Sequence, residues 1–275
     1  MAGLRKLQWG RYEICFSADT EPSVEPSALL DSLSHARELE KKGRGGIRVA
    51  NIANRPVACR KYVHGGLFRR ITGDSFLSGK RALNELQIML YLQEKDFPVV
   101  KPYCVIIEER PFRKNLYILT HYEENTQDLL DFLQGATQKE RRRIVKRLAE
   151  FMWQMEKLGV YHPDLHLNNV LVEPKTKALL FLDFDRAVRD GILANDMERM
   201  FWRLNRYTDK MEREGRLKIG SKEKLFFLKA YERVSGIDMA ARMEAKVARK
   251  SLLSKLGWFF EGLFYRERTN PTLGK

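Results

Sequence analysis

Short apolar runs dominate the first 120 residues of the chain and favour β-strands. β-Branched runs lie on either side of Ala53-Asn54-Arg55, a pattern that predicts a hairpin. Residues 103–109 and 116–120 have the same character and predict two more strands. We therefore expect a β-rich part that extends to about Thr120.

Apolar residues with helical spacing occur twice within this part. Residues 27–41 predict a short helix, with Ser27 as its N-cap and Gly43 ending it. Residues 80–95 predict a longer helix, because apolar side chains recur there every three to four residues. One prominent helix therefore accompanies the strands.

The remainder of the chain is mostly helical in pattern. Residues 138–158 place five apolar side chains on one face and predict a long amphipathic helix. Two short apolar runs follow, at 170–172 and 178–182, and the polar segment between them predicts a β-hairpin. Helical patterns return from about residue 192. The expected fold class is α+β, with a β-rich first part and a helical second part.

Composition and charge narrow the class of protein. The 275 residues are 44% hydrophobic, which excludes a disordered or low-complexity chain. Fifty Lys and Arg against 36 Asp and Glu leave a net charge of +14. Such a field favours an anionic partner, such as nucleic acid, acidic lipid head groups or a phosphorylated ligand.

The spacing of the cysteines and the length of the apolar runs indicate the cellular compartment of the protein. The three cysteines are widely spaced and form no CxxC pair, so we expect reduced side chains in the cytosol. The N-terminus lacks the pattern of a signal peptide. No apolar stretch approaches the roughly 18 residues of a membrane-spanning helix. The sequence thus predicts a soluble intracellular protein.

The residues with the clearest chemistry lie at 161–172. Asp164 and Asn169 are five positions apart in a polar loop between the long helix and the first strand of the hairpin, and Asp183 ends the second strand. Held by one hairpin, two carboxylates and an amide can converge on a Mg–nucleotide, because Mg²⁺ takes a few protein oxygens and leaves the rest to phosphates and water. An Asp–Asn pair alone is common and is usually just exposed to solvent. Its combination with the hairpin and an aspartate at the strand end arises by chance much less often.

This stretch resembles the protein-kinase-like fold, whose catalytic loop reads H-x-D-x-x-x-x-N and whose metal motif is D-F-G. The resemblance implies a bilobal α+β fold that uses ATP with Mg²⁺. It implies that Asp164 accepts the proton of the attacking hydroxyl and that Asn169 and Asp183 are metal ligands. His166 takes the place of the catalytic-loop lysine, where it either contacts the transferring phosphate or braces the loop. Asp185 replaces the last glycine of D-F-G, which argues against a protein kinase.

The resemblance also implies nucleotide clamps in the first part of the chain. Arg60 stands where the phosphate-binding lysine of V-A-I-K is expected, and Lys61 would take that role if the strand bulges. Glu85 is the expected ion-pair partner of that cation, although an exposed helix glutamate is the alternative.

Two further segments complete the expected nucleotide site. Gly43, Gly45 and Gly46 could form a turn that approaches phosphates, or a plain turn. The backbone at His121 and Tyr122 would form the hinge and pair with adenine.

A closer resemblance covers most of residues 10–210. The sequence is similar to the lipopolysaccharide core kinases, and within them to the 3-deoxy-D-manno-octulosonic acid (Kdo) kinase group. The segments that carry this likeness share the motifs of that family: Gly43-Arg44-Gly45, residues 59–67, Arg81 to Glu85, residues 97–102, His162 to Asn169, Asp183 to Arg186 and Arg203 to Tyr207. Departures at Val63, His64 and Tyr207 bear on the sugar acceptor more than on the fold.

This resemblance implies an ATP-dependent transfer of phosphate to a sugar hydroxyl of the lipopolysaccharide inner core, in the Kdo region. A heptose kinase of the same family and a kinase of a soluble small molecule are the alternatives. A catalytically inactive fold that binds nucleic acid is a remote one, because the chain lacks RNP, helix-turn-helix and zinc-finger motifs.

The same resemblance organises the whole chain as one kinase-like domain over 1–275. Residues 1–120 would be the N-lobe with the nucleotide clamp, and residues 121–275 the C-lobe with the catalytic loop and acceptor site. We expect an anionic glycolipid as partner and a peripheral location on the cytoplasmic face of the inner membrane. The basic, aromatic tail at 252–265 would either pack on the C-lobe or lie in the membrane interface. The oligomeric state stays open.

Overall fold

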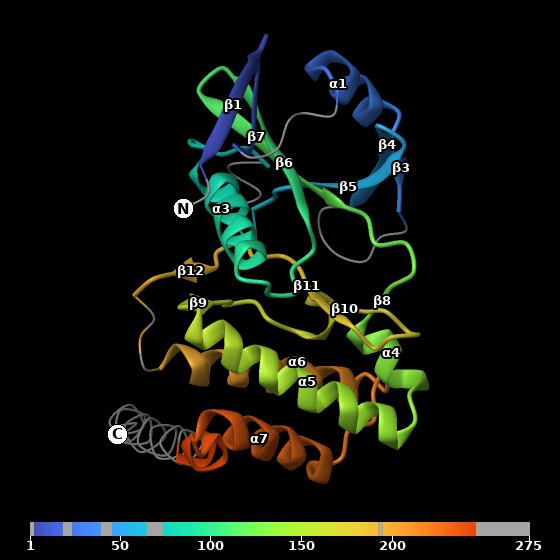
Figure 1. Cartoon of the computed structure of the whole chain (residues 1–275), viewed down its shortest axis with the longest axis vertical. Coiled ribbons are helices and arrows are strands. Elements are labelled where there is room, and N and C mark those ends of the chain that lie inside the picture. The colour runs from blue at the N-terminus through green and yellow to red at the C-terminus, as the bar shows by residue number, and fades with distance from the viewer. Residues whose placement is uncertain are drawn as a thin grey trace, which may run out of the picture.

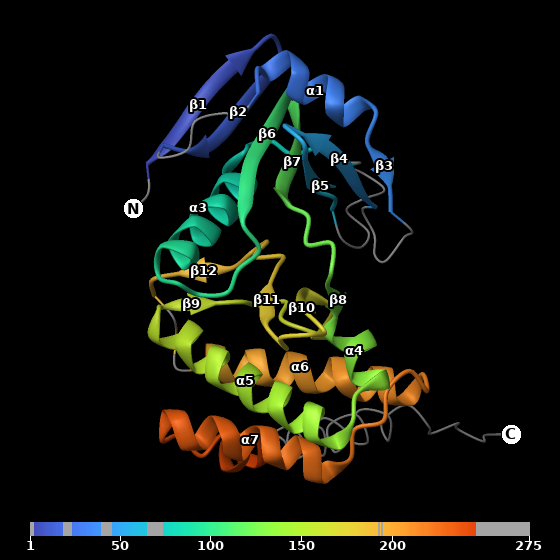
Figure 2. The same ribbon diagram turned by 45° about the vertical axis from the view of Figure 1, so that its right-hand side comes forward.

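The computed structural model describes residues 3–18, 24–39, 46–64, 74–191, 193 and 195–245. Strands gather at one end of the molecule and long helices at the other, as Figures 1 and 2 show. The expected α+β class is confirmed, with the β-rich part first and the helical part second, consistent with a kinase-like fold. The last strand of the β-rich part ends at His121, next to the predicted boundary at Thr120.

One antiparallel sheet of seven strands forms the first part, in the order β1-β2-β6-β7-β5-β4-β3. Its strands are β1 (Leu4–Trp9), β2 (Tyr12–Ser17), β3 (Arg37–Glu38), β4 (Ile47–Ile52), β5 (Arg55–Lys61), β6 (Pro102–Arg110) and β7 (Arg113–His121). Ala53 and Asn54 join β4 to β5 with φ angles of 49° and 60°. Positive φ at both central residues is the geometry of a two-residue hairpin turn, so the predicted hairpin is confirmed.

In the described part of the chain, two helices cover this sheet and divide its side chains between two clusters. The helices are α1 (Pro26–Ser34) and α3 (Lys80–Glu94). Successive residues of a strand point to opposite faces. Ile14 and Ile106 therefore pack with Leu29 of α1, whereas Cys15 and Val105 pack in the cluster that contains α3.

The second part is built from helices and three short strand pairings. Its elements are β8 (Gln127–Asp128), α4 (Leu129–Gly135), α5 (Gln138–Lys157), β9 (Val160–Tyr161), the 3-10 turn η1 (Leu167–Asn169), β10 (Val170–Val172), β11 (Leu179–Phe181), β12 (Val188–Arg189), α6 (Asp196–Arg213) and α7 (Ser221–Ser235). Thr137 and Glu140 form a reciprocal capping box at the start of α5, which satisfies free N–H groups there. The predicted helix at 138–158 and the predicted β10–β11 hairpin are both confirmed.

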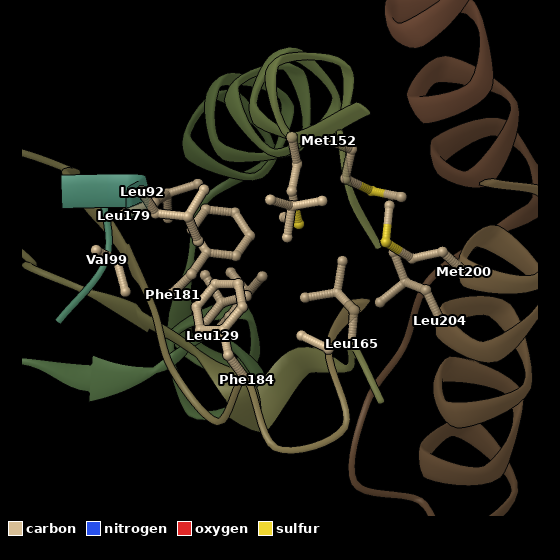
Figure 3. Packing of buried hydrophobic residues seen from close by; sticks show 14 of the residues in the cluster. Leu92, Val99, Leu129, Met152, Leu165, Leu179, Phe181, Phe184, Met200 and Leu204 are labelled. Carbon is tan, nitrogen blue, oxygen red and sulfur yellow. The ribbon is translucent and has the colours of Figure 1, made fainter. Parts of the chain in front are cut away.

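A single hydrophobic cluster joins the two parts. Figure 3 shows Leu92 and Val99, from α3 and the segment after it, beside Phe181 of β11 and Met152 of α5. Phe181 is fully buried and contacts the rings of Phe97 and Phe151 at 5.1 and 5.9 Å between centroids. This continuous packing fixes the hairpin that carries the candidate site against both parts of the molecule.

The helix predicted at 27–41 was placed too long and with the wrong cap. Helix α1 begins at Pro26 after the N-cap Glu25, because the fixed φ of proline suits the first helical position, and it ends at Ser34. Arg37–Glu38 then pair with β4 as strand β3. The open edge of β4 offers backbone partners there, which the apolar spacing of the sequence did not show.

Several other expectations have structural outcomes. All three cysteines are buried and free. No helix in the described part of the chain combines the length and the apolarity needed to cross a membrane. Gly43, Gly45 and the basic, aromatic tail at 252–265 lie outside the described residues.

Candidate active site

The polar loop after α5 is tied to the end of β11. His162 is fully buried, and its Nε2 lies 3.2 Å from the carbonyl oxygen of Leu182. The N–H of Leu182 donates to the carbonyl of Asn169 at 3.1 Å, and the Asn169 amide donates to the carbonyl of Asp164 at 3.0 Å. Asp183 follows Leu182 directly. These contacts gather Asp164, Asn169 and Asp183 in one place, as the spacing predicts.

Asp183 has the backbone of a residue at a sharp turn. Its φ is 62°, in the left-handed backbone region that residues other than glycine seldom adopt. Its Oδ1 is buried and accepts no hydrogen bond from the described residues, although an Arg60 nitrogen lies 3.2 Å away. A buried carboxylate oxygen of this kind is available to a cation.

The cation on β5 is Arg60. Its Nη2 donates to both carboxylate oxygens of Glu85 on α3, at 2.8 and 2.9 Å, and lies beside Asp183. Tyr62 donates its hydroxyl to the same Glu85 carboxylate. The adjacent Lys61 forms no ion pair with the described residues. The predicted Arg60–Glu85 pair is confirmed, and of the two cations it is Arg60 that contacts the site.

Burial and charge act in opposite directions on this pair. Burial works to lower the pKa of Arg60, but the carboxylates of Glu85 and Asp183 outweigh it and raise that pKa. Burial raises the pKa of the Glu85 carboxyl, and the Arg60 cation acts against that rise. The net effect raises the pKa of Glu85 to about 7.

A second ion pair links α3 to the segment after β11. Two nitrogens of Arg81 donate to the two carboxylate oxygens of Asp185, and Nε lies 2.5 Å from Oδ1. The Arg81 guanidinium also lies over the rings of Tyr62 and Phe76, at 5.6 and 5.2 Å from their centroids. This gives Asp185, where D-F-G has glycine, a defined partner.

His166 is held by an aromatic stack. Its ring lies on that of Tyr207 from α6, with centroids 4.5 Å apart and planes 12° from parallel. The Tyr207 hydroxyl donates to the side-chain oxygen of Asn168. Burial lowers the pKa of His166, which favours a neutral ring. The arrangement supports bracing of the loop more directly than contact with phosphate.

The Asp164 carboxylate meets an arginine from α6. Arg203 donates to Asp164 Oδ1, and both side chains are nearly half exposed. Asp164 is therefore open to a substrate, and its carboxylate has one guanidinium as partner.

The expected hinge and glycine turn are only partly described by the structure. The N–H of His121 donates to Lys101 and that of Tyr122 to Pro56, at 2.9 and 3.0 Å. These two N–H groups are therefore engaged within the protein, and the expected pairing of the hinge backbone with adenine stays a prediction. Gly46 has a φ of 58°, as a turn glycine should.

Comparison with known proteins identifies the kind of enzyme. Residues 33–231 match the lipopolysaccharide kinase (Kdo/WaaP) family. The chain belongs to this family. It is an ATP-dependent kinase, and the region of the match contains every described residue of the candidate site.

Individual relatives agree with that assignment. The chain is 28% identical to a 3-deoxy-D-manno-octulosonic acid kinase of Vibrio parahaemolyticus over 61% of its own length and 73% of the relative. It is 29% identical to a protein of the same name from Xanthomonas oryzae, over 62% of its own length and 69% of the relative.

Three contacts of the kinase site were not found by sequence reasoning. They are the pairs Arg81–Asp185, Arg203–Asp164 and Tyr62–Glu85. The four-residue spacing of Arg81 and Glu85 was a usable signal, because it puts both on one helix face toward the site. The other two pairs depend on where the elements pack.

Proposed function

We propose that this kinase transfers the γ-phosphoryl group of ATP to a hydroxyl of a Kdo residue in the lipopolysaccharide inner core. The observation that carries the chemistry is the position of Arg60, which contacts Glu85 of α3 and Asp183 of the hairpin together. The names of the relatives support the acceptor.

Asp164 is the proton acceptor in this proposal. Its carboxylate takes the proton of the acceptor hydroxyl as that oxygen forms a bond to the γ-phosphorus. The bond from this phosphorus to the oxygen bridging the β-phosphate breaks, and ADP leaves with the electron pair. Asn169 holds the backbone of Asp164 in position by its hydrogen bond to the Asp164 carbonyl.

Asn169 and Asp183 fit a magnesium ion. Both offer oxygen atoms, Asn169 is buried, and Asp183 Oδ1 accepts no hydrogen bond from the described residues. Mg²⁺ bound there would neutralise phosphate charge. The Arg60 cation, fixed by Glu85, lies beside this site and would orient the phosphates. Residues 1–120 act as the nucleotide clamp in this scheme, and residues 121–275 supply the acceptor side.

The acceptor is an anionic glycolipid, and the surface charge supports peripheral contact with the cytoplasmic face of the inner membrane. The net charge is +14. Exposed cations cluster at the start of α5: Lys139, Arg142, Arg143 and Lys146. A basic surface is attracted to anionic head groups, each cation near the surface contributing about 1 kcal/mol.

Transfer of labelled γ-phosphate from Mg-ATP to a panel of acceptors tests the proposal. The panel holds Kdo-lipid A, heptose-extended core, aminoglycosides and choline, with the Asp164→Ala variant as blank. We expect label on Kdo-lipid A with wild-type protein alone. Label confined to the heptose-extended core would make heptose the acceptor instead of Kdo. Label confined to a soluble compound would contradict a lipopolysaccharide acceptor.

A further inference from the structure

The ion pair between Arg203 and Asp164 brings a cation to the place where the acceptor must bind. An acceptor hydroxyl has to reach the Asp164 carboxylate to lose its proton. Arg203 donates to Oδ1 of that carboxylate, and its side chain is 47% exposed. Any group attached near the acceptor hydroxyl therefore comes within reach of a solvent-accessible guanidinium.

Arg203 has donors to spare. A guanidinium carries five N–H groups in a fixed plane, and the described partner of Arg203 is one oxygen of Asp164. An anion that approaches Asp164 is attracted by the half-exposed Arg203 guanidinium rather than repelled.

The proposed acceptor is a sugar acid and carries a carboxylate. Guanidinium and carboxylate groups match as planar, two-bond partners, a geometry that lysine does not reproduce. A carboxylate on the acceptor can take the place of Asp164 as the partner of Arg203.

We propose that Arg203 binds the carboxylate of the acceptor sugar and so selects an acidic sugar over a neutral one. The inference rests on the proposed function, because it requires an acidic acceptor at Asp164. Arg203 is then an acceptor-binding residue that changes its partner: it binds the Asp164 carboxylate in the free enzyme and the carboxylate of the sugar in the complex.

The rival explanation is that Arg203 only positions Asp164. The hydrogen bond from the Asn169 side chain already holds the Asp164 backbone. A positioning role predicts that loss of Arg203 lowers the rate equally for charged and uncharged acceptors. A binding role predicts that the loss of rate depends on the charge of the acceptor. The ratio of the rates on a charged and an uncharged acceptor therefore distinguishes the binding role from the positioning role.

The experiment compares two forms of one acceptor, lipid A with a single Kdo, as the free acid and as its carboxyl methylamide. kcat/KM is measured on both with wild-type protein, Arg203→Gln, Arg203→Lys and Arg206→Gln. The ratio of acid to amide is internal to each variant, so it does not depend on the fraction of protein that folds. Arg206→Gln is the matched control, because it removes an arginine of the same helix that does not contact Asp164.

We expect the wild-type protein and Arg206→Gln to prefer the acid by about 10- to 100-fold, the range for hydrogen bonds to a charged group. Arg203→Gln should bring the ratio close to one through a higher KM for the acid, and Arg203→Lys should restore it in part. A wild-type ratio near one, or an unchanged ratio in Arg203→Gln, would overturn the inference. Transfer by wild-type protein to neither form would instead contradict the proposed function.

Discussion

Replacing Glu85 by alanine should destabilise the protein by about 3 kcal/mol, because it removes one partner of a buried ion pair. Glu85 is 1% exposed and accepts two hydrogen bonds from Arg60 and one from Tyr62. Its removal leaves the Arg60 guanidinium with Asp183 at 3.2 Å and the face of the Tyr62 ring at 4.8 Å.

The magnitude follows from what remains around Arg60. Loss of one member of a buried pair costs about 3–5 kcal/mol when the other charge is left uncompensated. Asp183 compensates part of that charge, and the Arg60 side chain keeps 27% exposure, so we place the cost at the lower end of this range. Glu94→Ala on the same helix is the matched control. Glu94 is exposed, and its contact with Lys95 is 3.7 Å long, so its loss should cost under about 1 kcal/mol.

Urea unfolding of the wild type and the two variants is followed by far-UV circular dichroism. The shift in the urea midpoint of each variant, at a common dependence of the unfolding free energy on urea, gives its loss of stability. The KM for ATP should rise in Glu85→Ala and stay unchanged in Glu94→Ala, since Arg60 is no longer held beside Asp183. A Glu85→Ala protein as stable as Glu94→Ala would refute the reasoning that Glu85 anchors Arg60.

Two further predictions concern the segment around the metal motif. Asp185→Asn should lower the free energy of unfolding by about 1–3 kcal/mol, because Arg81 loses a partly buried two-bond carboxylate partner; a urea midpoint equal to wild type would contradict that role. Burial lowers the pKa of His162, so the unfolded chain takes up a proton near pH 6.5 that the folded protein resists. Stability from this source is full above pH 6.5 and is lost as the pH falls below it. The drop in Tm between pH 7 and 5.5 should therefore be smaller in His162→Gln than in wild type, whereas exposed His35→Gln should leave it unchanged; equal drops in all three proteins would be the contrary result.

Local sequence signals were enough to predict the site where its residues are close in the chain. Asp164 and Asn169 lie in one loop, and the β10–β11 hairpin that brings Asp183 to them has a clear apolar pattern. The Arg60–Glu85 pair spans 25 residues but was accessible through the strand and helix that carry it.

Contacts that depend on packing could not be predicted in this way. Arg81 and Asp185 are 104 positions apart: the spacing of Arg81 and Glu85 indicates which face of α3 carries Arg81, but the contact itself requires α3 to lie against the end of the hairpin. Strand β3 forms because the edge of β4 is open, although its residues share the spacing of the preceding helix. The N–H groups of His121 and Tyr122 donate to the carbonyls of Lys101 and Pro56, and these contacts depend on how the neighbouring segments pack.

Single-turnover transfer by the Asp164→Asn variant tests the central claim most directly, that Asp164 takes the proton in a nucleotide site built by Arg60 and Asp183. We expect the transfer step to slow by about 10²- to 10⁴-fold, the contribution of a general base, while the Kd for Mg-ATP stays unchanged. Asp209→Asn is the control, because Asp209 is a carboxylate of α6 that binds Lys224 instead of the loop. Transfer by Asp164→Asn as fast as by Asp209→Asn would contradict the claim.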